Sequence, residues 1–239
     1  MTRALPASYT ETFLELLDVV ASSHHAPEKL SVFWPDCGAR YTGALLVVGR
    51  AADTWYRPVE LAELRSESRR RAVLDEKRRW SEEDRLGDFV AGWNTSGFKR
   101  SSRSGFWRTV CATAGRLGLG SGPESLLSCC YTNLFKISGE KGNPSVSFRS
   151  VEIASSIELL RKEVAVFNPH RVLVISGHDW FHQFAKGLAL SERRLAGGYV
   201  STVIEDGDRR WVVAERPDSR RKGLLEADWV ERGGEALSV

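Results

Sequence analysis

The sequence has no apolar run of the roughly 18 residues that a membrane-spanning helix needs. The segment 1–12 also has no apolar stretch behind a basic start, which a secretory signal would require. We therefore expect no membrane association and a cytoplasmic location. Two glycine-rich motifs, GxGxxG and GxxxxGK[ST], are missing as well. Their absence weakens the case for a dinucleotide- or nucleoside-triphosphate-binding protein.

Cysteine is scarce: four residues in 239, with no CxxC pair among them. Cys129 and Cys130 are adjacent, and on a strand they would point to opposite faces, so they cannot easily share a metal ion. An iron–sulfur cluster would need four thiolates that converge on one point. We expect Cys37, Cys111, Cys129 and Cys130 to be small buried residues in a reducing compartment, and we expect no metal and no cofactor.

What the chain does contain is an alternation of short apolar runs with amphipathic stretches. The apolar runs predict strands at 44–48, 128–135, 171–175, 200–204 and 211–214, the last two as a hairpin turning at 206–208. The amphipathic stretches predict helices at 10–22, 107–117, 151–167, 179–190 and 225–231, and a charged helical stretch at 59–90. This order predicts an α/β fold of three layers, α/β/α, around a central, mainly parallel sheet of four to five strands. The length fits one domain over 1–239.

Polar residues follow several of these strands at the point where each one ends. The ends lie at 49–53, 133–136, 176–178 and 215–219. Because ligands bind at the carboxyl ends of parallel strands, we expect these segments to converge on one crevice.

The net charge is only +3, but the cations are clustered. The run 69–79 is interleaved with acidic residues, which favours pairing along a solvated helix. Two other runs have no acidic residues among them and are expected to contact the phosphate groups of a polyanion. Their cations are Lys99, Arg100 and Arg103, and Arg220, Arg221 and Lys222.

Taken in order, these segments resemble motifs of the uracil-DNA glycosylase superfamily. The strand and loop 45–53 (LLVVGRAAD) resemble the family's first motif, and 104–107 (SGFW) its aromatic region. The strand end 132–136 (TNLFK) resembles the segment whose Asn reads the base. The unit at 160–177 is similar to the family's helix–Asn-Pro–strand–Gly segment, and 216–219 (RPDS) stands where His-Pro-Ser would be. The resemblance extends over about 43–222.

Two positions depart from the family pattern. Ala51 stands where most members carry Asp or Asn, and Arg216 stands where they carry His. The resemblance therefore implies that the carboxylate comes from elsewhere, and Asp53 is the nearest candidate. An equally weighted role for Asp53 is to cap the following helix.

The resemblance implies base excision, in which a carboxylate steadies an oxocarbenium-like sugar while donors hold the departing base. Asp53 and Arg216 are the predicted catalytic residues. Arg216 would donate to the leaving base or hold a phosphate, roles that suit its permanent charge and planar fork, and a surface ion pair is its alternative role. The flipped base needs aromatic faces and edge-reading groups. The predicted base-binding residues are Ala51, Trp55, Phe106, Trp107 and Asn133. Asn133 has an alternative as a turn residue, and only one of Phe106 and Trp107 is expected to face the pocket.

Three functions follow from the sequence. The first is a monofunctional DNA glycosylase acting on uracil or, as the substituted motifs favour, on a bulkier modified pyrimidine such as a hypermodified phage cytosine. That substrate would imply antiphage defence. The second is a module that senses a modified base in DNA without cutting it. The third is an unrelated nucleotide-binding α/β protein. For the first function we expect a monomer that binds single- or double-stranded DNA.

Overall fold

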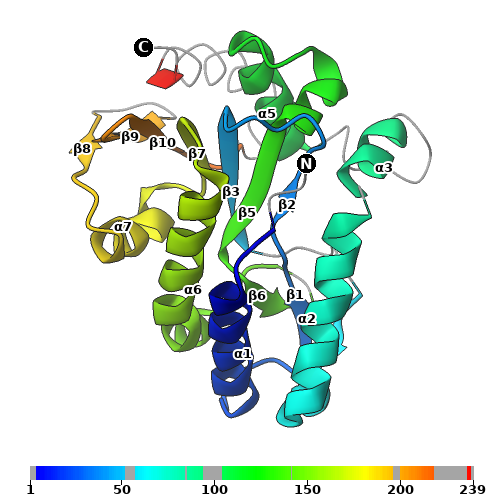
Figure 1. Cartoon of the computed structure of the whole chain (residues 1–239). Coiled ribbons are helices and arrows are strands. Elements are labelled where there is room, and N and C mark those ends of the chain that lie inside the picture. Colours follow the sequence, from blue (N-terminus) through cyan, green and yellow to red (C-terminus); the bar gives the residue numbers. More distant parts are fainter. Residues whose placement is uncertain are drawn as a thin grey trace.

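The computed structural model describes residues 4–51, 57–83, 85–93, 104–140, 142–195, 200–217 and 236–237. Four neighbouring parallel strands form the centre of its larger sheet (Figure 1). In spatial order they are β5 (Cys129–Phe135), β3 (Leu45–Ala51), β7 (Arg171–Ile175) and β10 (Arg209–Ala214). All four are almost wholly apolar and buried, as expected for strands covered on both faces.

Antiparallel strands extend this sheet at both edges, so it has seven strands rather than the four to five expected. β2 (Asp36–Cys37) pairs with β5, while β9 (Val200–Asp206) pairs with β10 and with β8 (Arg193–Arg194). The predicted β9–β10 hairpin and its turn are confirmed. β2 and β8 are two-residue strands without an apolar run, which is why hydrophobic periodicity missed them.

A second, three-stranded sheet was not predicted. β1 (Lys29–Val32) lies between β4 (Val59–Glu60) and β6 (Ile137–Gly139), antiparallel to both. The prediction of one helical stretch over 59–90 is therefore wrong at its start. Val59 is buried against β1, and Glu60 and Glu63 form a capping box for the short 3-10 helix η1 (Leu61–Arg65). The helices α2 (Glu67–Glu82) and α3 (Arg85–Ala91) follow.

Helices cover both faces of the larger sheet, which confirms the α/β/α layering. Along β3, Leu45 and Val47 face one core with α3, α5 (Gly105–Arg116) and the 3-10 helix η2 (Gly122–Ser128). Leu46 and Val48 face the other core, with α6 (Val146–Phe167) and α7 (His178–Gly187). This alternation follows from the two-residue period of a strand.

A third core lies where α1 (Ala7–Ala21) packs against α6 and α2 (Figure 1). Phe13 and Leu17 of α1 meet Val32 of β1 and Leu74 of α2 there. None of the helices in the described ranges is long and apolar enough to span a bilayer.

The structure joins Cys37 to Cys130 by a disulfide, so the expectation of four unlinked cysteines is wrong for this pair. β2 and β5 place the two residues directly opposite each other in an antiparallel register. Their separation of 93 residues hides this pairing from the sequence. Cys111 and Cys129 are thiols, and Cys129 and Cys130 point into opposite cores, as predicted.

Candidate functional site

The carboxyl ends of the four parallel strands contact one another, as the sequence predicts. Gly49 of β3 lies opposite Asn133 of β5. Nε of Arg50 donates a hydrogen bond of 2.6 Å to the carbonyl oxygen of Ser176, just after β7. The backbone N–H of Gly177 then donates to the carbonyl oxygen of Ala214 at 2.9 Å, which joins β7 to β10.

This edge contains the topological switch point of the sheet. After β3 the chain crosses one face, through α5, to reach β5. After β5 it crosses the other face, through α6, and passes β3 to reach β7. Connections that leave neighbouring strands on opposite faces open a crevice at their carboxyl ends. The strand order therefore predicts the crevice of this sheet between the ends of β3 and β7.

The start of α5 completes this edge. Gly105, its first residue, lies so close to the segment after β10 that an added Cβ atom would be 3.1 Å from Cβ of Pro217. A larger residue at position 105 would push the two segments apart. The segment 104–107, predicted to lie at the site, is thus held beside the end of β10.

Gly49, Asn133 and Phe106 form a neutral group at this edge, which we call the Asn133 group. A Cβ atom at Gly49 would collide with Oδ1 of Asn133 and would lie 3.8 Å from Cε2 of Phe106. Glycine at position 49 therefore leaves the space that the Asn133 amide occupies. Asn133 is only 7% exposed, and nothing in the described part of the chain hydrogen-bonds to its side-chain amide. The amide is available to a ligand.

Phe106 and Trp107, both predicted to bind the base, take different places. Phe106 is half-buried beside Gly49. Trp107 is buried in the core on the α5 face, with ring centroids 4.9 Å from Phe89 and 5.2 Å from Tyr131. Phe106 also packs at the margin of that core. That one of the two aromatic rings faces a bound base stays a prediction.

A buried polar network, which the sequence did not reveal, lies directly behind Asn133. Nζ of Lys136 donates to the backbone oxygen of Asn133, to Oγ1 of Thr132 and to Oε2 of Glu163 at 2.9 Å. The hydroxyl of Tyr9 donates to Oε1 of Glu163 at 2.6 Å. Burial lowers the pKa of Lys136, while Glu163 opposes this shift. Lys136 and Glu163 are fully buried, so the network holds the backbone of Asn133 with strong charged hydrogen bonds.

The other predicted site residues are placed as follows. Ala51 is the last residue of β3, half-buried, and pairs with Phe135. Arg216 is exposed, two residues after β10. The remaining predictions lie outside the described residues: Asp53, Trp55, Lys99, Arg100, Arg103, Arg220, Arg221 and Lys222.

Two further arginines near the site were not predicted. Arg50 is the penultimate residue of β3, and Arg149 lies in the first turn of α6. Both guanidinium groups lie over the ring of Trp180 in α7. Arg149 is a single cation that no local pattern singled out, whereas Arg50 lies in the predicted strand end 49–53 but was not itself expected to bind.

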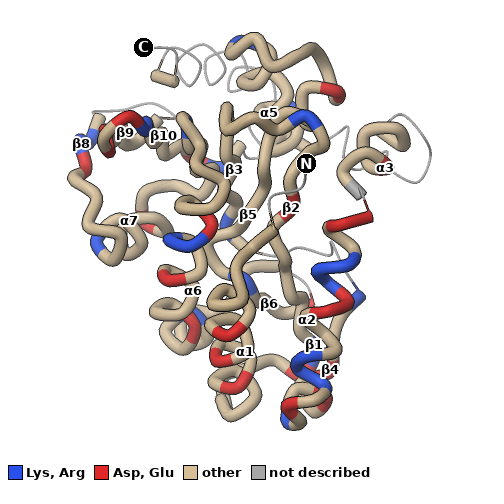
Figure 2. Tube along the Cα trace, viewed as in Figure 1, with Lys and Arg blue, Asp and Glu red and all other residues tan. Residues whose placement is uncertain are grey.

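The basic run on α2 contrasts with these arginines, because its cations have acidic partners. Arg71 pairs with Glu11 and Glu67, and Arg78 pairs with Asp75 and Glu82. Arg69 and Arg70 have acidic partners too. Acidic and basic positions alternate along the helix in Figure 2. The prediction of a solvated, ion-paired helix surface is confirmed for Arg69, Arg71 and Arg78. It is wrong for Lys77, which is buried and donates to Glu76 and to the backbone oxygen of Arg57.

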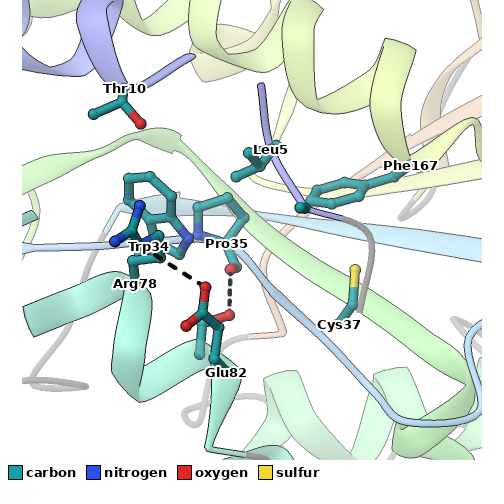
Figure 3. A pocket seen from close by; sticks show the side chains of 10 residues that line it. Leu5, Thr10, Trp34, Pro35, Cys37, Arg78, Glu82 and Phe167 are labelled. Atoms are coloured by element: carbon teal, nitrogen blue, oxygen red, sulfur yellow. Dashed lines mark hydrogen bonds and ion pairs between the residues drawn. The ribbon is translucent and has the colours of Figure 1, made fainter. Parts of the chain in front are cut away.

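A cavity of about 130 Å³ lies away from this edge, between the N-terminal segment, β2 and α2 (Figure 3). Trp34, Pro35 and Phe167 line it, together with the ion-paired Arg78 and Glu82. None of the predicted site residues lines it. Its volume is below the roughly 300–1,000 Å³ of ligand pockets, so we place the candidate site at the strand ends instead.

The residues present offer no metal centre, since no three His, Cys, Asp or Glu side chains gather at one place in the described ranges. A comparison of the chain with protein-family models and with curated proteins finds no match to either.

Proposed function

We propose that this chain is a DNA glycosylase that hydrolyses the N-glycosidic bond of a modified pyrimidine flipped out of the DNA stack. The observation that supports it best is the Asn133 group. Its amide has no hydrogen-bond partner in the described part of the chain, and both its Oδ1 and the ring of Phe106 lie beside Gly49 of β3. An amide offers one donor and one acceptor to a pyrimidine edge, and an aromatic ring offers a stacking face.

In this proposal the first segment after β3 supplies the chemistry. Asp53 stabilises positive charge on the sugar and orients the attacking water. Arg216 follows β10 at the same edge and stabilises negative charge on the departing base. The product is an abasic site. The substitutions Ala51 and Arg216 favour a base bulkier than uracil, such as a hypermodified phage cytosine, and hence a role in antiphage defence.

The proposal is tested with duplex and single-stranded oligonucleotides that contain one uracil, 5-hydroxymethylcytosine or glucosylated cytosine. Each is incubated with the protein and then treated with alkali, which breaks the strand at abasic sites. We expect breaks at one of these bases and none in unmodified DNA. If no substrate breaks while one of them binds tightly, the protein is a module that senses a modified base, with Ala51 as the mark of lost catalysis.

A pair of variants tests the assignment of the carboxylate. Asp53→Asn keeps the size of the side chain but removes its charge, and we expect cleavage to fall by two or more orders of magnitude while DNA binding survives. Asp208→Asn is the matched control, because Asp208 is exposed in the β9–β10 turn, at the opposite end of β10 from the site. Equal rates for the two variants would remove Asp53 from the mechanism.

A further inference from the structure

Two arginines far apart in the sequence, Arg50 and Arg149, lie over one aromatic ring at the carboxyl edge of the sheet, and a third, Arg216, follows β10 at the same edge. Arg50 comes from the end of β3, Arg149 from the first turn of α6, and Arg216 from the segment after β10. The charges of Arg149 and Arg216 both act on Arg50. We call these three residues the arginine cluster. It lies at the same sheet edge as the Asn133 group but uses the α6–α7 face.

Trp180 organises two members of the cluster. Cζ of Arg149 lies 4.2 Å and Cζ of Arg50 lies 5.1 Å from the centroid of its ring, within the range of cation–π attraction. The ring itself packs edge-on against Phe135 at the end of β5, with centroids 5.8 Å apart. The backbone oxygen of Ser176 also fixes Nε of Arg50. Both guanidinium groups are therefore held in place before any ligand arrives.

The cluster has an excess of positive charge. Burial lowers the pKa of Arg50, and the positive charges of Arg216 and Arg149 lower it further, while Glu215 and Asp179 oppose them. Among the described residues, the charges that act on Arg50 are thus those of two arginines and two carboxylates. In the described part of the chain, none of the three arginines forms an ion pair within 4.0 Å, unlike the arginines of α2.

An unpaired hydrogen-bond donor in the cluster is a second, independent observation that points to a ligand. Nε of Arg149 is buried and has no hydrogen-bond partner among the described residues. Leaving a buried hydrogen-bond donor of a charged group without a partner raises the free energy of the folded protein. The repulsion within the cluster and this unpaired donor would both be relieved by one anion in the crevice.

We infer that the arginine cluster binds a phosphate group of a nucleic acid or nucleotide. Guanidinium groups match the oxygens of phosphate in charge and in forked geometry. The crevice at a topological switch point is also where α/β sheets commonly bind phosphorylated ligands. The site goes beyond the proposed glycosylase activity, because a phosphate group can bind there whether or not any base is excised.

The test is equilibrium binding of a fluorescein-labelled thymidine dodecamer without a terminal phosphate, measured by anisotropy at several salt concentrations. The variants are Arg50→Gln, Arg149→Gln and Arg216→Gln. Arg116→Gln is the matched control, since Arg116 is an exposed cation at the far end of α5 and the same unit of charge is lost. We expect each cluster variant to weaken binding about tenfold and to reduce the slope of log Kd against log salt by about one. The control should stay within about twofold.

Competition by inorganic phosphate and by thymidine 5′-monophosphate distinguishes a site for free phosphate or nucleotides from a site for the nucleic-acid backbone. If either competitor displaces the dodecamer at millimolar competitor concentrations, and Arg149→Gln abolishes this competition, the site also binds free phosphate or phosphate monoesters. Binding of the dodecamer that neither competitor displaces assigns it to the backbone diester alone. If the three cluster variants bind every probe as well as Arg116→Gln does, the inference is wrong.

Two measurements separate a loss of binding from a loss of folding. Arg216 is exposed, so its variant should keep the near-UV circular dichroism of the wild type, and its affinity alone can decide the outcome. Arg149→Lys keeps the charge but lacks the planar fork, and it should recover only part of the affinity. The two proposals fail on different results. Dodecamer binding that does not depend on the cluster overturns the phosphate site, and cluster-dependent binding without cleavage of any modified substrate overturns the glycosylase.

Discussion

The carboxyl edge of the sheet and the body built by α1, α2 and α6 differ in how their polar and charged side chains are paired. In the body, Glu163 of α6 is fully buried against Lys136, and Arg78 of α2 lies between Asp75 and Glu82, although Oε1 of Glu152 on α6 has no hydrogen-bond partner among the described residues. At the edge, the side-chain amide of Asn133 and Nε of Arg149 have no hydrogen-bond partner among the described residues. Paired polar groups serve stability, whereas prearranged groups without partners are what a binding site needs. Variants in the two regions should therefore have different effects.

The largest effect is expected in the body, for Lys136→Met. Removing the cation leaves the buried carboxylate of Glu163 with only the hydroxyls of Tyr9 and Thr132. Breaking a buried pair in this way costs about 3–5 kcal/mol of unfolding free energy, which urea denaturation followed by circular dichroism will measure. The double variant Lys136→Met/Glu163→Gln removes the unpaired charge but keeps an oxygen for Tyr9, so it should regain part of the loss. A single variant within about 1 kcal/mol of the wild type would contradict this account.

At the edge, Gly49→Ala should affect function and not stability. Its Cβ atom would displace the end of the Asn133 side chain, which can move by rotation, so the unfolding free energy should change by less than about 1 kcal/mol. The displaced amide would misplace the base, and we expect base excision to fall tenfold or more, since a shift of about 1 Å can cost about 100-fold. Gly115→Ala in α5 is the control, because its Cβ would meet only an ordinary contact. Equal excision by both variants would separate Asn133 from base binding.

The smallest effect is expected for Arg78→Gln on α2. Arg78 is exposed and ion-paired, and such pairs contribute about 0–1 kcal/mol. Its loss should leave the urea midpoint and the affinity for the thymidine dodecamer almost unchanged. A loss of affinity as large as that of Arg149→Gln would show that cations with acidic partners also bind DNA. The distinction between the two regions would then fail.

Hydrophobic periodicity was enough to predict the four parallel strands and the helices α1, α5, α6 and α7, because each buries a continuous apolar face in a run of neighbouring residues. The interleaved charges of α2 also predicted its ion pairs, because i,i+3 and i,i+4 neighbours meet on any helix. The second sheet and the short strands β2 and β8 were missed. Each is set by a partner far away in the chain, and two to four residues hold no periodicity of their own.

For the candidate site, the sequence by itself determined that polar residues follow the strand ends and that Gly49, Phe106 and Asn133 belong to the same edge. Tertiary structure alone decided which of Phe106 and Trp107 faces that edge, since both stand next to each other at the start of α5. It also decided that Arg50, Arg149 and Arg216 lie at the same edge of the sheet, and that Lys136 holds Asn133 from behind. The physical reason is that parallel strands bring together residues separated by a whole helical crossover, and no local pattern records which of them meet.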